Sequence, residues 1–282
     1  MVEFILNNEK IATNLPSGSL LLDLVRTTKM LTGTKIGCRE GDCGACTVLI
    51  GTAIDGRMDY SQVTSCLTPI GNVAGKHVVT IEGLNMDELS PVQQHMINES
   101  GTQCGFCTVG FVVSLSSFCL ANNAATYDEA IAAIDGNICR CTGYKSIERA
   151  AQKITNDLKE KDTDQVTDWL IENQFIPAYF KTIPDRLTSI TASPPSVSAK
   201  ILLGGGTDLY VQKPDDLVDL EVSHLTDLPQ LKFIQLENET VRIGGGTTVT
   251  DFLESDEIQN IFPRLWEHVK LVSSSYSKYF HL

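Results

Sequence analysis

Residues 1–86 alternate between apolar and polar positions in short runs that are separated by turns. Val2, Phe4 and Leu6 recur at every second position, which is the period of a β-strand. Further short strands are predicted at 11–14, 47–50 and 77–81. Leu20, Leu21, Leu24 and Val25 instead share one helical face, and Ser19 in front of them is the expected N-cap. We therefore expect a small β-rich domain with one early helix.

Residues 87–162 change to a helical period. Ser90-Pro91-Val92-Gln93 combines a capping box with proline at the first helical position. Thr126 and Glu129 form a second capping box. A last helix is predicted from Ser146, with an apolar stripe at Ile147, Ala150, Ile154 and Leu158. Four helices are expected here, and the charged run 159–162 is predicted to separate them from the rest of the chain.

Residues 165–282 contain two glycine-rich turns, at 204–206 and 244–246. Each turn follows an apolar run and precedes a predicted helix, which is typical of an α/β arrangement. The chain as a whole is therefore expected to be an α+β multidomain protein, with domains at 1–86, 87–162 and 165–282.

The net charge of −13 limits which macromolecules and membrane surfaces the chain can bind. Such a field repels nucleic acids and anionic membrane surfaces, so neither is an expected partner. The apolar runs are too short to span a bilayer, and the N-terminus lacks the basic start of a signal peptide. We expect a cytoplasmic protein. In that reducing compartment, nine cysteines are better explained as metal ligands than as disulfides.

The first set of cysteines has the spacing of plant-type [2Fe–2S] proteins, Cys38-x4-Cys43-x2-Cys46, with Cys66 further along. Glycines at 37, 41 and 44 would let backbone N–H groups approach the sulfur atoms. Zinc sites more often use two separate Cys-x2–4-Cys hairpins, so zinc is disfavoured here.

The second set is Cys104-x2-Cys107 with Cys139-x-Cys141. Taken alone, this spacing also suits zinc or a dithiol redox site. Cys107 precedes a predicted helix, whose N-terminus favours thiolate over thiol. Cys119 lies on an apolar helical face, and we assign it no role beyond packing.

The segments around these cysteines resemble the molybdenum hydroxylase family, in both order and spacing. They are GCREGDCGACT at 37–47, QCGFCT at 103–108 and CRCTG at 139–143. The resemblance implies a β-grasp ferredoxin domain followed by a four-helix [2Fe–2S]-binding domain. It gives the first cluster Cys38, Cys43, Cys46 and Cys66, and the second Cys104, Cys107, Cys139 and Cys141. It also places Gln103 near the molybdopterin of a partner subunit.

The third section resembles the FAD-binding domain, of the PCMH type, in xanthine dehydrogenases. The implied FAD contacts are Leu202, Leu203, Gly204, Gly205, Gly206, Thr207, Asp208 and Leu209. Such domains continue beyond the position of Leu282, so we expect an incomplete domain that binds FAD weakly or not at all. A one-base shift in a permitted coding sequence for 276–282 gives Ile-Arg-Asn-Ile-Ser-Thr, a motif of these domains. We therefore predict a frameshift near Ser275.

The resemblance implies an electron-transfer subunit of a xanthine dehydrogenase-type enzyme. Electrons would pass from a molybdenum-cofactor large subunit through two [2Fe–2S] clusters toward FAD and NAD. The isolated chain is not expected to oxidise xanthine. Three alternatives remain: a small subunit of an aldehyde or carbon monoxide oxidising molybdoenzyme, a free electron carrier or regulatory iron–sulfur protein without catalysis, and a truncated inactive gene product that only binds iron–sulfur clusters.

Overall fold

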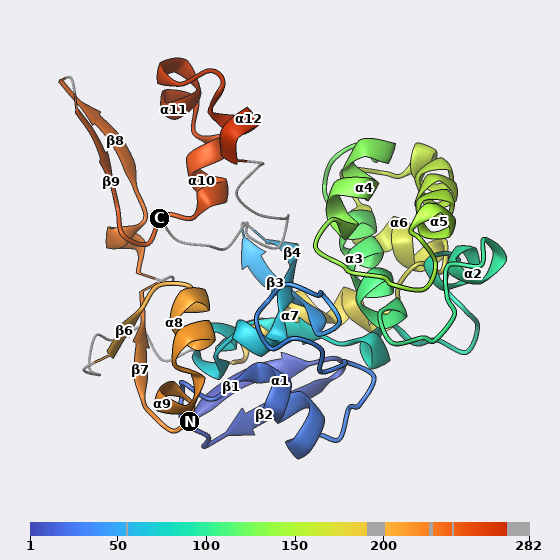
Figure 1. The fold of residues 1–282 in the computed structure, drawn as a ribbon, viewed down its shortest axis with the longest axis horizontal. Coiled ribbons are helices and arrows are strands. Elements are labelled where there is room, and N and C mark those ends of the chain that lie inside the picture. Colours follow the sequence, from blue (N-terminus) through green and yellow to red (C-terminus); the bar gives the residue numbers. More distant parts are fainter. Residues whose placement is uncertain (55, 191–200, 226–227, 239, 270–282) are drawn as a thin grey trace.

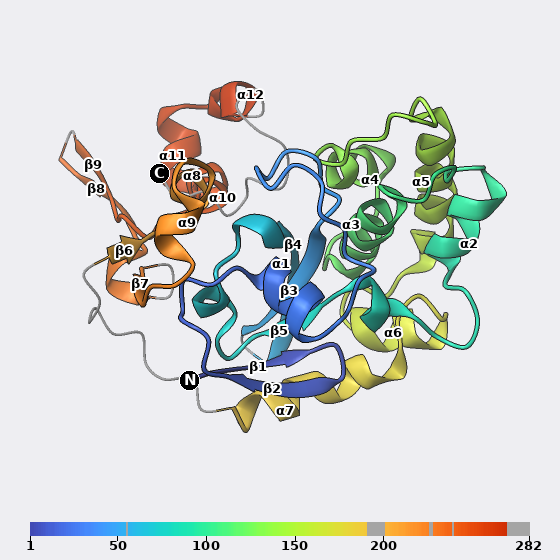
Figure 2. The ribbon, with the colours of Figure 1, turned by 60° about the horizontal axis from the view of Figure 1, so that its bottom comes forward.

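The computed structural model describes residues 1–54, 56–190, 201–225, 228–238 and 240–269. A central sheet lies between a helical unit and a third part made of short strands and helices (Figure 1). Figure 2 shows the same order from a second direction. None of the helices in the described ranges is long and apolar enough to cross a membrane. The frameshift predicted for the chain end falls outside the described residues and stays a prediction.

The central sheet has five strands in the order β2-β1-β5-β3-β4. β1 and β5 run parallel, and the other neighbours are antiparallel. The strands are β1 (Val2–Leu6), β2 (Glu9–Thr13), β3 (Thr47–Ile54), β4 (Arg57–Thr64) and β5 (His77–Val79). The four strands predicted from the alternation are confirmed to within a few residues, and β4 was not predicted.

Both faces of this sheet are buried. Successive side chains of a strand point to opposite faces, so Phe4 and Leu6 enter one core while Ile5 enters another. α1 (Leu21–Asp23) and the π-helical turn η1 (Leu24–Thr28) cover the first face with Leu21 and Leu24. The helical unit covers the second face, where Ile5 shares a core with Leu49 and Val79.

The predicted N-cap at Ser19 is wrong. The cap position of α1 is Leu20, which makes no side-chain cap hydrogen bond. The Ser19 hydroxyl instead donates to the carbonyl of Val218 at 2.8 Å. Ser19 therefore serves a contact with the third part of the molecule, which local sequence cannot show.

Four α-helices lie between residues 88 and 160, namely α2 (Pro91–Asn98), α3 (Thr108–Leu120), α4 (Tyr127–Ile134) and α5 (Lys145–Asp157). Both predicted capping boxes are confirmed, Ser90 with Gln93 and Thr126 with Glu129. α5 begins one residue before the predicted start at Ser146. α3 is buried along most of its length, because it lies between the sheet and the other helices.

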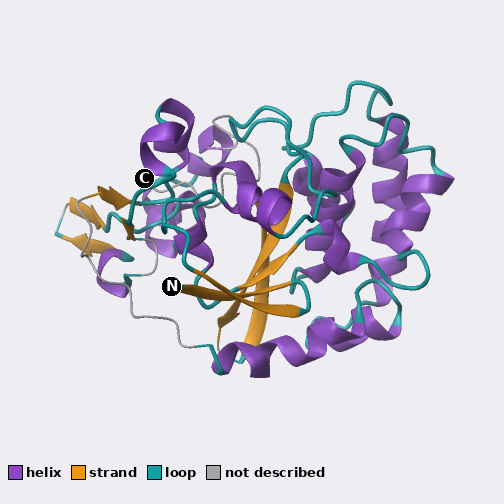
Figure 3. Ribbon diagram, turned by 90° about the horizontal axis from the view of Figure 1, so that it is seen from below, coloured by secondary structure: helices purple, strands orange, loops and turns teal. Residues whose placement is uncertain are grey.

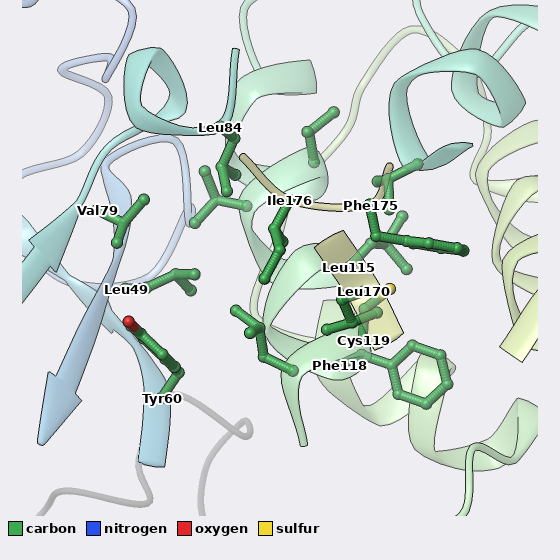
Figure 4. Close-up of a cluster of buried hydrophobic side chains, with 14 of the residues drawn as sticks. Leu49, Tyr60, Val79, Leu84, Leu115, Phe118, Cys119, Leu170, Phe175 and Ile176 are labelled. Atoms are coloured by element: carbon green, nitrogen blue, oxygen red, sulfur yellow. The ribbon is translucent and has the colours of Figure 1, made fainter. Parts of the chain in front are cut away.

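The segment from 166 to 190 packs on the first two parts of the molecule, although the sequence suggested that it belongs with the third. It contains α6 (Val166–Glu172), η6 (Ala178–Thr182) and α7 (Ile183–Thr188). Phe175 and Ile176 lie in the same core as Leu49 of the sheet and Leu115 of α3 (Figure 4). The charged run 159–162 is no simple separator either, since Lys161 is only 8% exposed.

The third part holds two small sheets and several short helices (Figure 3). β6 (Ile201–Leu203) pairs in parallel with β7 (Val222–His224), and β8 (Ile234–Glu237) pairs antiparallel with β9 (Thr240–Ile243). The helices are α8 (Thr207–Gln212), α9 (Pro214–Leu217), α10 (Val249–Glu254), α11 (Asp256–Ile261) and α12 (Leu265–Val269). The remaining short 3-10 turns are η2 (Ser65–Leu67), η3 (Ile70–Val73), η4 (Ile81–Leu84), η5 (Leu158–Glu160) and η7 (Pro229–Leu231).

Candidate metal centres

The first set of cysteines gathers at one end of the β3–β4 ladder. Thr47 pairs with Thr64 at this end. Cys46 directly precedes Thr47, and Cys66 follows Thr64 by two residues, so the ladder brings these two thiols together. Both are buried, and the Ser65 hydroxyl fixes the Cys46 carbonyl at 2.7 Å. Cys38 and Cys43 lie in the loop that leads into β3 and are half-buried.

Backbone N–H groups point at the sulfur atoms of this loop. Cys38 N–H donates to Cys43 Sγ at 3.4 Å, and Glu40 N–H donates to Cys38 Sγ at 3.3 Å. The loop turns this tightly because Gly41 and Gly44 take left-handed conformations, with φ of 81° and 67°. The approach also depends on Gly37, where a Cβ would lie 2.5 Å from Cys43 Sγ.

The thiols of the first set influence each other's protonation in pairs. The hydrogen bond between Cys46 and Cys66 lowers the pKa of Cys46 and raises that of Cys66, which burial raises further. Burial raises the pKa of Cys38, but hydrogen bonds from the backbone of Glu40 and Cys43 outweigh it and leave this pKa below its usual value. Burial raises the pKa of Cys43. Each pair therefore holds one thiol that ionises more readily than its neighbour.

The second set gathers where two helix-connecting turns meet. Cys104 and Cys107 lie in the turn before α3, and Cys107 is the N-cap residue of that helix. Cys139 and Cys141 lie in the turn between α4 and α5. The sulfur atoms of Cys104 and Cys141 are 3.6 Å apart, and both residues are exposed. Cys107 and Cys139 form the other pair, through a hydrogen bond between their thiols.

Cys139 has hydrogen-bond partners beside its sulfur atom. Burial raises its pKa, but hydrogen bonds from the hydroxyl and the N–H group of Thr142, at 3.1 and 3.5 Å from its sulfur, and from Cys107 and the Cys141 backbone together lower it by more. Its own N–H donates to the Tyr144 hydroxyl at 3.0 Å. For Cys107 the opposite holds, since burial raises its pKa to about 12. This pair again contains one readily ionised thiol.

Each set thus consists of two pairs of thiols. Within the described ranges no three His, Cys, Asp or Glu side chains converge as they would around a single metal ion. Cys119 stands apart from both sets: it is fully buried in the core with Leu115 and Phe118, and burial raises its pKa to about 12 (Figure 4).

The remaining predicted site residues lie at the edges of these two centres. Gln103 is exposed beside the second set, and its side-chain amide donates to the Cys141 carbonyl at 3.2 Å. The predicted FAD segment 202–209 forms the end of β6, a turn with Gly206 at φ 78°, and the start of α8. A cleft of about 400 Å³ is lined by residues of the first set and of α8 and α9, with Cys38, Cys66 and Tyr210 among them.

The two centres are in direct contact, which the spacing of the cysteines does not predict. The carbonyl of Cys43 accepts a hydrogen bond from Ile138 N–H at 3.0 Å. Asn137, next to Ile138, is buried and donates from its side chain to the Gly44 carbonyl at 3.1 Å. Asn137 lies two residues before Cys139, and that closeness to a predicted ligand is the only signal that could have pointed to it.

Two sequence families match separate parts of the chain. Residues 4–71 match the family described as a 2Fe-2S iron–sulfur cluster binding domain. Residues 80–152 match the family described as a [2Fe-2S] binding domain. These ranges hold the first and the second set of cysteines respectively.

Similar proteins are found among molybdenum hydroxylases. The nicotine 6-hydroxylase small subunit of Paenarthrobacter nicotinovorans is 40% identical over 142 residues, which cover 50% of this chain and 81% of that subunit. A xanthine dehydrogenase of Blastobotrys adeninivorans is 46% identical over 140 residues, and the match spans 48% of this chain and 10% of that enzyme. The chain therefore matches only about a tenth of the length of the xanthine dehydrogenase.

Among solved structures, quinoline 2-oxidoreductase from Pseudomonas putida 86 matches with 34% identity and a TM-score of 0.48. The match covers 55% of this chain and 93% of the quinoline 2-oxidoreductase chain.

Proposed function

This chain belongs to the iron–sulfur region of the molybdenum hydroxylase family, and from that premise we propose that it is the electron-transfer subunit of a xanthine dehydrogenase-type enzyme. In this proposal it accepts electrons from a molybdenum-cofactor subunit that oxidises a purine. It then passes them through two [2Fe–2S] clusters toward FAD and NAD.

The pairing of the thiols is the observation that carries the proposal. In a [2Fe–2S] cluster held by four cysteines, each iron takes two of the thiolates. The thiols fall into the pairs that such an arrangement needs, namely Cys38 with Cys43, Cys46 with Cys66, Cys104 with Cys141, and Cys107 with Cys139. A single tetrahedral zinc would instead draw four thiolates to one point.

The surroundings of the cysteines suit one-electron chemistry, which the clusters supply when they are bound. N–H groups such as those of Cys38 and Glu40 stabilise charge on the sulfur atoms. Burial of Cys46 and Cys66 keeps water from the inner side of the first centre. The chain's own contribution is thus to hold eight thiolates and to set the reduction potentials through hydrogen bonding and burial.

The exposure of the two centres supports a direction of transfer. Cys104 and Cys141 are exposed, with Gln103 and the apolar side chains of Phe106 and Ile138 beside them. An apolar surface around an exposed metal centre fits a partner protein, so we assign this side to the molybdenum-cofactor subunit. The first centre borders the cleft toward α8, which we assign to the side of the electron acceptor.

FAD contact at the turn 204–206 is a further part of the proposal. The described residues offer it a strand, a glycine turn and the six-residue helix α8. Because this turn is the only predicted flavin segment, we expect the purified chain to hold much less than one FAD per protein. Flavin fluorescence after denaturation measures it, and one FAD per chain would contradict the expectation.

Iron content and electron paramagnetic resonance test the function. We expect about four irons per chain, and two distinguishable signals after reduction with dithionite. Replacing Cys43 with serine should remove one signal only. Replacing Cys119 with alanine is the matched control and should leave both. Tightly bound zinc in place of iron would overturn the proposal, and so would oxidation of xanthine with NAD by this chain alone.

A further inference from the structure

The two centres meet at a junction of three segments, which are the loop before β3, the start of α3 and the turn after α4. At this junction the carbonyl of Cys43 accepts a hydrogen bond from Ile138 N–H at 3.0 Å. Ile138 directly precedes Cys139. A single hydrogen bond therefore joins the backbone of a proposed ligand in the first centre to the backbone beside a proposed ligand in the second.

Asn137 adds a second bond beside this one. Its side-chain amide donates to the carbonyl of Gly44 at 3.1 Å, and Gly44 directly follows Cys43. The other end of the amide is held as well, since its oxygen accepts from the Ser114 hydroxyl at 2.8 Å. Asn137 is 3% exposed and Ser114 is fully buried. The orientation of the amide is thus fixed from both ends, and it holds the Cys43–Gly44 peptide against the turn that carries Ile138.

The backbone approaches at this junction leave no room for a side chain at Gly44 or at Gly110. A Cβ on Gly110 would lie 2.2 Å from the Gly44 carbonyl oxygen, and a Cβ on Gly44 would lie 2.4 Å from the Asn137 amide nitrogen. The Thr47 hydroxyl also holds the Gly44 carbonyl in place, because it donates to the same oxygen at 2.6 Å. The three segments can therefore approach this closely only because both positions are glycine.

We propose that Asn137 is a positioning residue for electron transfer between the two centres. The proposal rests on the proposed function, in which both cysteine sets hold [2Fe–2S] clusters. Electronic coupling is stronger through covalent and hydrogen bonds than across a gap. By anchoring Gly44, Asn137 keeps the Cys43 carbonyl bonded to Ile138 N–H and so keeps this hydrogen-bonded route between the two sets intact.

If Asn137 served packing alone, its replacement should affect electron transfer no more than the replacement of any other buried residue that links the sheet to the helical unit. Gln62 provides such a link, because its side-chain amide donates from β4 to the Ala133 carbonyl at the end of α4, at 2.7 Å. Gln62 is 8% exposed and is remote in sequence from all eight paired cysteines except Cys66. Its replacement by alanine is the matched control for the replacement of Asn137.

The experiment compares the unmodified full chain with the variants Asn137→Ala, Ser114→Ala and Gln62→Ala. Iron content and the two resonance signals first establish that each protein carries its clusters. Flash photoreduction then gives the rate at which electrons redistribute between the clusters, and titration gives both potentials. Hydrogen–deuterium exchange with mass spectrometry follows the peptide that contains Ile138, a readout that does not depend on electron transfer.

We expect Asn137→Ala to keep both signals, to exchange faster at Ile138, and to slow the redistribution by about tenfold, less than the roughly hundredfold loss that a 1 Å misplacement of reacting groups can cause in an enzyme. Ser114→Ala should slow it less, and Gln62→Ala should leave it unchanged. If Asn137→Ala loses a cluster, Ser114→Ala decides in its place. An unchanged rate of redistribution in the cluster-loaded Asn137→Ala variant overturns the inference. If that variant has lost a cluster, an unchanged rate in Ser114→Ala overturns it. If the unmodified chain holds no iron, the proposed function fails and takes the inference with it.

Discussion

At the scale of single residues, His77 shows how a buried titratable group can make stability depend on pH. Its Nε2 lies 2.9 Å from the Asn7 carbonyl oxygen, which can only accept, so Nε2 carries the proton. Nδ1 then accepts from the Tyr60 hydroxyl at 2.8 Å. Tyr179 and Phe180 enclose the ring edge-on. The neutral imidazole is therefore the form that fits, and burial lowers the pKa of His77 to about 4.

This low pKa predicts a loss of stability in mild acid. As the pH falls, the unfolded chain protonates His77 near pH 6.5, at a higher pH than the folded chain does. The contribution of His77 to the free energy of unfolding is therefore complete above pH 6.5 and falls toward pH 4. Between pH 7.5 and 5.5 the loss should be about 1–2 kcal/mol from this residue. We expect His77→Gln to show a smaller loss over the same interval in denaturant unfolding, with iron content followed in parallel. An equal loss in both proteins would contradict the assignment.

At the scale of elements, α3 ends on a buried cation. Lys161 Nζ donates to the carbonyls of Ala121 at 2.8 Å and Cys119 at 3.4 Å, at the C-terminal end of the helix. These carbonyls have no partner within the helix, and the negative end of the helix dipole attracts a positive charge. Burial lowers the pKa of Lys161, so holding the charge there has a cost that the two carbonyls offset.

Replacing Lys161 with methionine keeps the apolar stem and removes the charge. We expect the free energy of unfolding to fall by about 1–2 kcal/mol, because two buried carbonyls lose their donor. Lys159→Met is the matched control, since Lys159 is exposed two residues earlier, and it should change stability by less than about 0.5 kcal/mol. Equal effects in the two variants, measured by urea unfolding, would show that the cap contributes nothing.

The elements that sequence could predict are those whose signals are local. The two capping boxes and the alternation of Val2–Leu6 need only neighbouring residues, and all three are present in the structure. β4 alternates too, but two of its buried positions are Gln62 and Thr64, and polar residues at core positions hid the strand. α6 and α7 share their core with Leu49 and Leu115, far away in the chain, so local sequence does not show their place.

The candidate centres also have some features that local sequence predicts and others that depend on the fold. Spacing along the chain was enough to group eight cysteines into two sets and to leave Cys119 out. It could not show which thiols would pair, because that depends on how the β3–β4 ladder and the turns around α3 bring them together. Nor could it show the bond from Ile138 to Cys43, which joins residues nearly a hundred positions apart.

At the scale of the whole molecule, the third part docks on a loop beside the first centre. Gly18 N–H donates to the Leu220 carbonyl at 3.0 Å, and the buried Tyr210 hydroxyl donates to the Gly18 carbonyl at 2.6 Å. Ser17 bonds both the N–H and the carbonyl of Val222 through its hydroxyl. The docking thus combines one backbone–backbone hydrogen bond with bonds from the Tyr210 and Ser17 hydroxyls, and it covers part of the core around Cys46 and Cys66.

Gly18→Ala should weaken this docking. The new Cβ would lie 2.3 Å from the Leu217 carbonyl oxygen, so backbone must move, at about 1–3 kcal/mol. We expect faster hydrogen–deuterium exchange in 201–225, with exchange in α3 and the central sheet unchanged. Gly245→Ala is the control, because a Cβ there has no atom within 4 Å. Protection that stays equal in 201–225 would refute the docking contact.

The two buried faces of the central sheet also bear on how the chain is made. The face of Ile5, Leu49 and Val79 is covered by residues of α3 and by later ones as far as Ile190. A ribosome that has just released Val79 must therefore add about a hundred residues, which takes roughly 5–20 s at about 5–20 residues per second. During that time a finished sheet would show an apolar face to water. Nascent chains stalled before α7 should therefore bind chaperones, and they should aggregate more readily than the completed chain.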